Sequence, residues 1–443
     1  MDELMRILLL HDYNTRVVLV GTLLLGISCG LLGVYMLLRR RALIGDAISH
    51  AALPGVALAF MWTADIGGEK SLVWLLLGAS ISGGLGGATV LLLKHWAGIR
   101  EDAALGIVLS VFFGAGVALL KIAQNLPGAN AAGLEGFIYG KAALMTTEDV
   151  WLAAGTAAVS IASVCLLEKE FRILCFDPAL ARSQGWPVGW LDALLLLLVV
   201  VTTMVGLQAV GLILIIALLI VPAAAARFWT HRLAATLAIS AAMGASACSL
   251  GTLLSASAEK IPSGAAIVLV ACGMFAISFV VGRQRGILWQ WWRRQRIRIA
   301  YDEQHLLRAM YELLESRQAL PARLTGLRSS PPISLATVAQ YRHWSRWWTR
   351  WVAKRLEERG LAILEPGPTV ALTPRGLISA ARAVRNHRLL EIYLVDQAAA
   401  RENEVDRAAD YLEHGLVPEL VAELSGQLPA DDDAAVPPSP HQI

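Results

Sequence analysis

The chain has 443 residues, of which 56% are hydrophobic and only 16% are charged, and its formal net charge is +3. Soluble domains carry about 25% charged residues, so the composition excludes a wholly soluble protein and places most of the chain in lipid. The charge is also uneven, because residues 1–282 hold 16 Lys and Arg and 16 Asp and Glu, whereas residues 283–443 hold 22 and 19. This split predicts a membrane domain followed by a soluble one.

Apolar segments of roughly 20 residues, enough to cross the hydrocarbon core, recur along the first part of the chain. The candidate spans are residues 17–38, 44–63, 71–93, 103–122, 150–167, 188–204, 207–226, 233–254 and 262–282. The sixth and seventh form one apolar run that only the stretch around Gly206 interrupts, so eight spans remain an alternative to nine. We expect an all-α polytopic membrane protein with about nine transmembrane helices.

Lys and Arg in short loops indicate the orientation of these spans. With nine spans, the arginines at 39–41 and the basic cluster at 283–298 lie on the same side, and the opposite loops carry few positive charges. This places the N-terminus outside and the C-terminal domain in the cytoplasm, whereas eight spans would break the pattern at one end. Residues 283–300 are rich in Trp and Arg and predict an anchor at the lipid headgroups.

An ionisable pair lies in the second span. Asp46 and His50 stand four residues apart and therefore share one face of a helix, and an ionisable residue inside a span marks an ion path by default. A carboxylate with an imidazole suits Mn²⁺, Fe²⁺ or Zn²⁺ better than Cu(I), and Pro54 could unwind the helix and free backbone carbonyls as further ligands. The alternative is that Asp46 caps the helix near the cytoplasmic headgroups while His50 packs against a neighbour.

The stretch RRRALIGDAISHAALPGVALAF (residues 39–60) resembles the signature of permeases of the ABC-type zinc/manganese/iron uptake family. Similar segments follow in order at residues 100–111, 177–192, 210–227 and 262–270, so the resemblance covers nearly all of residues 15–282. It implies a homodimer or a pair of sister permeases, a separate ABC ATPase and an extracytoplasmic metal-binding protein. In this family Asp46 and His50 would be metal-path residues, and transport would need no cofactor.

A short cytoplasmic helix is predicted between the fifth and sixth spans, because Asp177-Pro178 is a helix-start signal and Gly185 a stop signal. It resembles the element that couples these permeases to their ATPase, which would involve Asp177, Pro178, Ala181 and Gly185. The alternative is a simple amphipathic connector. Residues 136–142 only approximate a phosphate-binding loop, with too few residues between the glycines and Ala where Ser or Thr must hold Mg²⁺. The chain is therefore predicted to be no enzyme, with ATP hydrolysis supplied by another chain.

Residues 301–425 resemble metal-dependent repressors of the diphtheria-toxin-repressor class, which implies a mostly α winged-helix domain. The similar segments are a helix at 301–316, a helix-turn-helix-like stretch at 333–361, a wing ending at 372–376, and the motifs RNHRLLEIYL (385–394) and VDRAADYLEH (405–414). The predicted organisation is thus a permease domain at 1–282, a juxtamembrane segment at 283–300, this domain at 301–425 and a disordered tail at 426–443.

In that family the last two motifs supply ligands for a regulatory metal. The residues that would hold a regulatory Mn, Fe or Zn ion here are His387, Glu391, Asp410, Glu413 and His414. Asp406 stands where some members have His, and His305 and Arg308 stand where a Met or acidic ligand is expected. Arg308 cannot ligate a cation, which puts one of the family's two sites in doubt. The alternative is that these are ordinary solvated helix charges.

The predicted recognition helix carries both basic and aromatic side chains. The basic ones, which could meet DNA phosphates, are Arg346, Arg350, Lys354 and Arg355. The aromatic ones, which suit packing against protein or membrane, are Trp344, Trp347, Trp348 and Trp351. Because a domain tethered at the bilayer also has restricted access to DNA, the sequence favours metal sensing or dimerisation over DNA binding.

The sequence therefore favours the permease subunit of an ATP-driven Mn/Zn/Fe importer in the cell membrane, with a fused cytoplasmic metal-sensing domain. A membrane-anchored, metal-responsive transcription regulator is the alternative, but it would need neither a coupling helix nor a polar pair inside a span. A carrier driven by the proton gradient would need further intramembrane acids, and beyond Asp46 the spans are nearly free of them. An Asp/His pair does not decide among the three metals.

Overall fold

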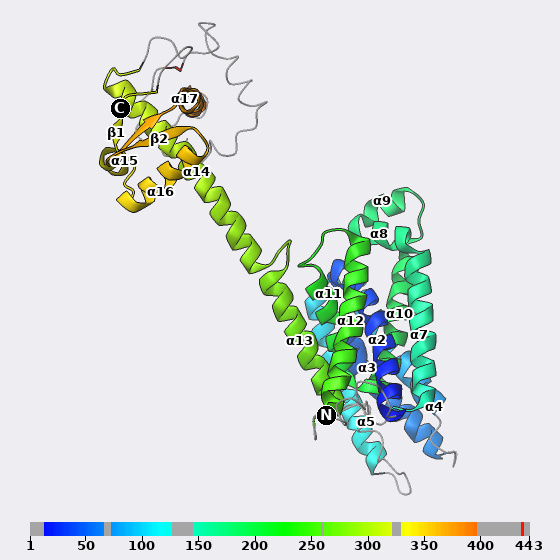
Figure 1. Ribbon diagram of the computed structural model, residues 1–443. Coiled ribbons are helices and arrows are strands. Elements are labelled where there is room, and N and C mark those ends of the chain that lie inside the picture. Colours follow the sequence, from blue (N-terminus) through cyan, green and yellow to red (C-terminus); the bar gives the residue numbers. More distant parts are fainter. Residues whose placement is uncertain are drawn as a thin grey trace. The chain divides into compact units, whose positions relative to one another are not determined.

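The computed structural model describes residues 13–65, 72–125, 145–257, 261–320, 329–396 and 436–437. It divides into two compact units, a membrane unit at Met1–Gln290 and a C-terminal unit at Trp291–Ile443 (Figure 1). The boundary between the two units falls within residues 283–300, the predicted juxtamembrane segment.

The membrane unit is a bundle of apolar helices that carries two short helices at one end (Figure 1). Its described helices are α2 (Tyr13–Leu38), α3 (Ile44–Asp65), α4 (Leu72–Trp96), α5 (Glu101–Gln124), α7 (Thr147–Leu166), α8 (Glu168–Phe176), α9 (Pro178–Ser183), α10 (Val188–Val210), α11 (Leu212–Ala226), α12 (Leu233–Ser257) and α13 (Ser263–Val281). Eight of them are long and apolar enough to cross a membrane, and α11 is a shorter apolar helix. The prediction of eight to nine membrane helices is confirmed.

The break between α10 and α11 falls at Gly211 and not, as predicted, around Gly206. Gly211 has φ +87° and ψ 170°, a region of backbone conformation that essentially only glycine adopts. Gly206 lies inside α10, where a Cβ would come within 2.2 Å of the Ile215 side chain. Gly211 therefore ends α10, whereas Gly206 allows α11 to pack closely against α10. A uniformly apolar sequence does not distinguish these two roles.

Helix α3 is held in the bundle by close backbone contacts. A Cβ on Gly55 would lie 2.0 Å from the Gly78 carbonyl oxygen of α4, and Ser82 of α4 donates a hydrogen bond to the Ala51 carbonyl at 2.6 Å. Small residues and hydroxyl donors are the usual means of packing helices in lipid. They fix the helix that carries Asp46 and His50 against its neighbour.

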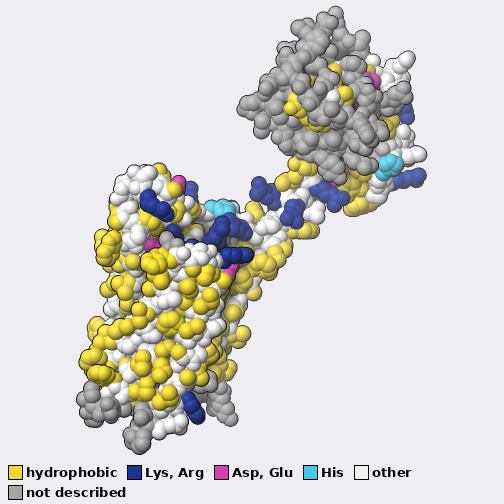
Figure 2. Space-filling model, turned by 180° about the vertical axis from the view of Figure 1, so that it is seen from behind, with side chains coloured by type: hydrophobic (Ala, Val, Ile, Leu, Met, Phe, Trp, Pro, Cys, Tyr) yellow, Lys and Arg dark blue, Asp and Glu magenta, His cyan; other side chains and the backbone are white. Residues whose placement is uncertain are grey.

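Figure 2 shows hydrophobic side chains over the sides of the membrane unit and Lys and Arg gathered at the end where α8 and α9 lie. This distribution is expected for a unit whose sides face lipid and whose basic side chains lie at a membrane surface.

The C-terminal unit has a helix-turn-helix followed by a β-hairpin and a long helix. Its elements are α14 (Ile287–Ser316), β1 (Ile333–Ser334), α15 (Leu335–Tyr341), α16 (Arg346–Glu358), β2 (Ala362–Glu365), β3 (Thr369–Leu372) and α17 (Pro374–Asp396). The antiparallel sheet has the order β1-β3-β2, with Ile333 opposite Val370 and Ala362 opposite Leu372. The predicted mostly α winged-helix domain is confirmed.

The long helix α14 is continuous, whereas the sequence predicted an anchor segment followed by a separate helix. Its later turns bury Leu306, Met310 and Leu314 against α15, α16, the sheet and α17. Ser334 and Ser345 cap the starts of α15 and α16 by accepting hydrogen bonds from Ala336 N and Trp348 N, as serine does at many helix N-termini.

Candidate metal sites

The predicted pair Asp46 and His50 lies on one face of α3, as its spacing requires. Asp46 occupies the first turn, where the helix dipole favours a negative charge, and its Oδ1 is 3.4 Å from His50 Nε2. The side chains of Asp46 and His50 are 35% and 21% exposed. The His50 ring packs edge-on against Phe113 of α5, with 4.9 Å between ring centroids, and its Nδ1 is buried without a hydrogen-bond partner.

Pro54 stands inside a continuous α3, so the predicted unwinding of the helix is wrong. Proline nevertheless lacks an N–H, so the carbonyl of His50, four residues earlier, loses its helical hydrogen bond. The backbone therefore offers an oxygen at His50 itself. In the part of the chain that the structure describes, no three or more His, Cys, Asp or Glu side chains form a group that could hold a metal.

An ion-pair cluster lies beside the turn from α2 to α3. Asp192 of α10 accepts hydrogen bonds from Arg39 at 2.8 Å and from Arg41 at 2.9 Å to each carboxylate oxygen. Arg39 also donates to the carbonyl of Leu174 in α8 at 2.9 Å. From the sequence, these arginines indicated only the topology of the spans. Their partner Asp192 lies some 150 residues further along the chain, so no local pattern predicts the contact.

The predicted cytoplasmic helix is present as α9, and its start and stop signals are confirmed. The Asp177 carboxylate accepts from Ala179 N and Leu180 N at 3.1 and 2.9 Å, Pro178 is the first helical residue, and Gly185 follows with φ +83°. Ala181 is buried, whereas Leu180 is exposed. One face of the short helix, at Ala181, is thus packed against the membrane unit, and another, at Leu180, is exposed.

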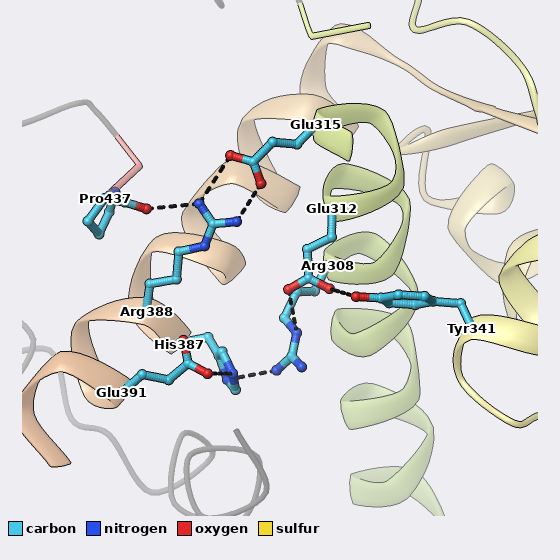
Figure 3. Close-up of polar contacts among 8 residues, drawn as sticks. All are labelled: Arg308, Glu312, Glu315, Tyr341, His387, Arg388, Glu391 and Pro437. Atoms are coloured by element: carbon cyan, nitrogen blue, oxygen red, sulfur yellow. Dashed lines mark hydrogen bonds and ion pairs between the residues drawn. The ribbon is translucent and has the colours of Figure 1, made fainter. Parts of the chain in front are cut away.

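In the C-terminal unit, His387 and Glu391 lie on one face of α17 and are buried, with 1% and 0% of the side chains exposed. The alternative of solvated helix charges is therefore wrong for these two residues. His387 Nε2 is 3.2 Å from Glu391 Oε1, and Arg308 of α14 lies 2.7 Å from His387 Nδ1 (Figure 3).

The same guanidinium also contacts an acid on its own helix. Arg308 Nε is 3.2 Å from Glu312 Oε1, and Tyr341 donates to Glu312 Oε2 at 3.1 Å. Burial raises the pKa of Glu312, and the Arg308 guanidinium partly opposes this rise. The four side chains form a row that runs Glu312, Arg308, His387, Glu391.

This row does not fit a divalent metal at His387. Arginine only donates hydrogen bonds, so Nδ1 accepts and the ring proton is on Nε2, which faces Glu391. A metal at Nδ1 would meet a guanidinium that is already 2.7 Å from that nitrogen. The other predicted ligands, Asp410, Glu413 and His414, lie outside the described residues, as do Asp406 and the predicted tail apart from residues 436–437.

Helix α16, the predicted recognition helix, turns most of its aromatic side chains inward. Trp348 and Trp351 of α16, and Trp344 just before it, pack on the core of the C-terminal unit, and Trp348 donates to Asp302 of α14 at 3.1 Å. Trp347 is 72% exposed. The tryptophans that suggested packing against a partner therefore mainly hold α16 on α14.

Arg355 of α16 is likewise engaged within the unit, by Glu303 of α14 at 2.9 Å. The other three predicted phosphate-binding cations, Arg346, Arg350 and Lys354, are exposed.

Comparison with known proteins places these features in a family context. The model of the ABC 3 transport family matches residues 11–282, and that of the iron dependent repressor, metal binding and dimerisation domain matches residues 373–429. The chain is 36% identical over 417 residues to the manganese transport system membrane protein MntC of Bacillus subtilis (strain 168), covering 94% of this chain and 91% of that protein.

It is also 42% identical over 303 residues to the zinc transport system membrane protein TroC of Treponema pallidum (strain Nichols), covering 68% of this chain and 100% of that protein. Among solved structures it resembles PsaBC from Streptococcus pneumoniae in complex with Fab, with 31% identity and a TM-score of 0.54. That similarity covers 62% of this chain and 94% of the other.

Proposed function

Because this chain belongs to the ABC 3 transport family, we propose that it is the permease subunit of an ATP-driven importer for a divalent metal ion. It is a multi-pass membrane permease and not itself a catalytic ATPase, and its C-terminal part is of the iron-dependent repressor type. Manganese and zinc are the foremost candidate substrates, because the relatives named above are manganese and zinc transport proteins. Iron is the third candidate.

The observation that carries this proposal is the Asp46–His50 pair within an apolar bundle. The Asp46 Oδ1 lies 3.4 Å from His50 Nε2, so a carboxylate and an imidazole nitrogen face one another on α3, and the His50 carbonyl, which Pro54 leaves without its helical hydrogen bond, is a further oxygen on the same residue. Hard and borderline donors of this kind suit Mn²⁺, Fe²⁺ and Zn²⁺. The partial exposure of both side chains allows an ion to enter and leave, which a transport path requires.

The proposed partners follow from family membership and from the basic end of the membrane unit. Helix α9, with Asp177, Pro178, Ala181 and Gly185, is the proposed contact for the ATPase. The Asp192 cluster ties α8 and α10 to the turn that precedes Asp46, so a movement of α8 and α9 would reach the metal path. An extracytoplasmic metal-binding protein and a second permease chain, identical or sister, complete the assembly, with the C-terminal unit in the cytoplasm.

A regulatory metal in the C-terminal unit remains part of the proposal in a narrower form. Of the five residues predicted from the sequence, His387 and Glu391 are engaged with Arg308. A regulatory Mn, Fe or Zn ion would therefore be held by Asp410, Glu413 and His414, the acids and imidazole of the following motif.

The test is reconstitution of the full chain in vesicles with its ATPase subunit. We expect uptake of Mn²⁺ or Zn²⁺ that requires ATP and that Asp46→Ala and His50→Ala each abolish. Asp102→Ala is a matched control, because Asp102 also lies near the start of an apolar helix but is exposed, and it should retain uptake. Uptake without the ATPase, or uptake that both substitutions leave unchanged, would refute the proposal.

A further inference from the structure

The buried polar row of the C-terminal unit contains its own cation. Arg308, Glu312, His387 and Glu391 are each at most 5% exposed, and they join α14 to α17 (Figure 3). A guanidinium keeps its charge in proteins, and burying a charge is costly unless partners and hydrogen bonds compensate it. Here the contacts to Glu312 and His387 supply that compensation.

We infer that the Arg308 guanidinium is a built-in cation that takes the place of a metal ion beside His387 and Glu391, so that this junction of α14 and α17 assembles without metal. A metal ion in such a position would draw a carboxylate and an imidazole from two helices together. Arg308 makes both contacts, at 3.2 Å to Glu312 and 2.7 Å to His387. The inference concerns the C-terminal unit alone and holds whatever ion the membrane unit transports.

His387 then has a different role from that of a ligand. Its Nδ1 accepts from Arg308 and its Nε2 lies 3.2 Å from Glu391 Oε1, so the neutral ring lies between a cation and a carboxylate. The planar, forked guanidinium suits this because it can donate to two partners in fixed directions. A change in intracellular metal would leave this junction unchanged.

A second guanidinium one residue along α17 provides a matched control. Arg388 pairs with Glu315 of α14 and donates to the Pro437 carbonyl (Figure 3). It joins the same two helices and is equally buried, but its contacts go to Glu315 and Pro437 and bypass the row around His387. Loss of Arg388 therefore reports the cost of removing a buried guanidinium without emptying the place beside His387.

The test uses the full-length protein in detergent, with bound manganese counted per chain and amide exchange followed in peptides of α14 and α17. For the wild type we expect the same protection around residues 303–312 and 384–391 with chelator or with saturating Mn²⁺, and no loss of bound manganese in His387→Gln. Arg308→Met should exchange at least about tenfold faster there in chelator, and Mn²⁺ should restore part of the protection. Arg388→Met should also exchange faster, but Mn²⁺ should restore none of it.

Two results would overturn the inference. One is the loss of one bound manganese ion per chain in His387→Gln, which would make His387 a metal ligand. The other is an Arg308→Met protein that is as protected as the wild type in chelator, which would mean that no cation is needed at this junction. If Arg308→Met fails to fold, the manganese count in His387→Gln still decides.

Discussion

The two units contain the same local motif in opposite surroundings. Asp46 and His50 on α3, and His387 and Glu391 on α17, are each a carboxylate and an imidazole four residues apart, with contacts of 3.4 and 3.2 Å. The first pair is partly exposed and its ring faces Phe113. The second pair is fully buried and its ring faces Arg308. Helical spacing brings the two groups together in both places, but the third group decides whether a cation can join them.

The largest effect is expected when the Asp46–His50 pair is given a neighbouring guanidinium, as His387 has in Arg308. Phe113→Arg would place a guanidinium beside His50, where the ring centroids are now 4.9 Å apart. Charge repulsion at this distance in a medium of low dielectric costs a divalent ion several kcal/mol. We expect ATP-driven uptake in vesicles to fall at least about tenfold. Phe113→Leu, which keeps the site apolar, should stay within about threefold of the wild type, and equal losses in both variants would contradict the argument.

Removing one negative charge from each pair sharpens the comparison. Glu391→Gln should lower the free energy of unfolding by roughly 3 kcal/mol, because the buried row loses a counter-charge, while uptake by the folded protein stays nearly unchanged. Asp46→Asn should cost less than about 1 kcal/mol, since the side chain is partly exposed, yet abolish uptake. Thermal unfolding in detergent and uptake in vesicles measure the two effects. Similar stability losses in both variants would show that burial does not separate the pairs.

A third comparison concerns ion pairs within the membrane unit. Asp192→Asn removes the negative charge that Asp192 supplies to the buried guanidinium groups of Arg39 and Arg41, so we expect a loss of roughly 2 kcal/mol in thermal unfolding. Glu168→Gln is the control, because its pair with Arg172 is exposed and 3.8 Å long, and it should cost less than about 0.5 kcal/mol. If the two variants lose equal stability, the Asp192 cluster does not tie the turn before Asp46 to α8 and α10.

The sequence predicts the membrane fold well because lipid leaves few alternatives. Each span needs a long apolar helix, so composition alone locates α2 to α5 within a few residues. The end of α10 was misplaced because Gly206 and Gly211 lie in one apolar run, and only backbone conformation shows which one ends the helix. The continuity of α14 was missed because Trp and Arg near a membrane also indicate an interfacial anchor.

At the candidate sites, the sequence predicted only the contacts between residues of the same helix. The i, i+4 pattern placed Asp46 beside His50 and His387 beside Glu391. The partners that distinguish these pairs are remote, since Arg308 lies 79 residues from His387, and Phe113 lies on another helix. The resemblance to repressors placed Arg308 at a ligand position, and a guanidinium cannot bind a metal. The packing of α14 on α17 was needed to show that it contacts Glu312 and His387.

The smallest expected effect separates coupling from metal binding within the membrane unit. Asp177→Ala removes the two hydrogen bonds that cap α9, which costs about 1 kcal/mol locally and leaves Asp46 and His50 unchanged. If α9 is the ATPase contact, equilibrium metal binding should stay at the wild-type level while ATP hydrolysis stimulated by the permease falls about threefold. Ser183→Ala, at the other end of α9, removes one exposed hydrogen bond to Leu180 and should have little effect. Unchanged stimulation of ATP hydrolysis in Asp177→Ala would mean that α9 is a simple connector. The ATPase would then have to contact another part of the basic end.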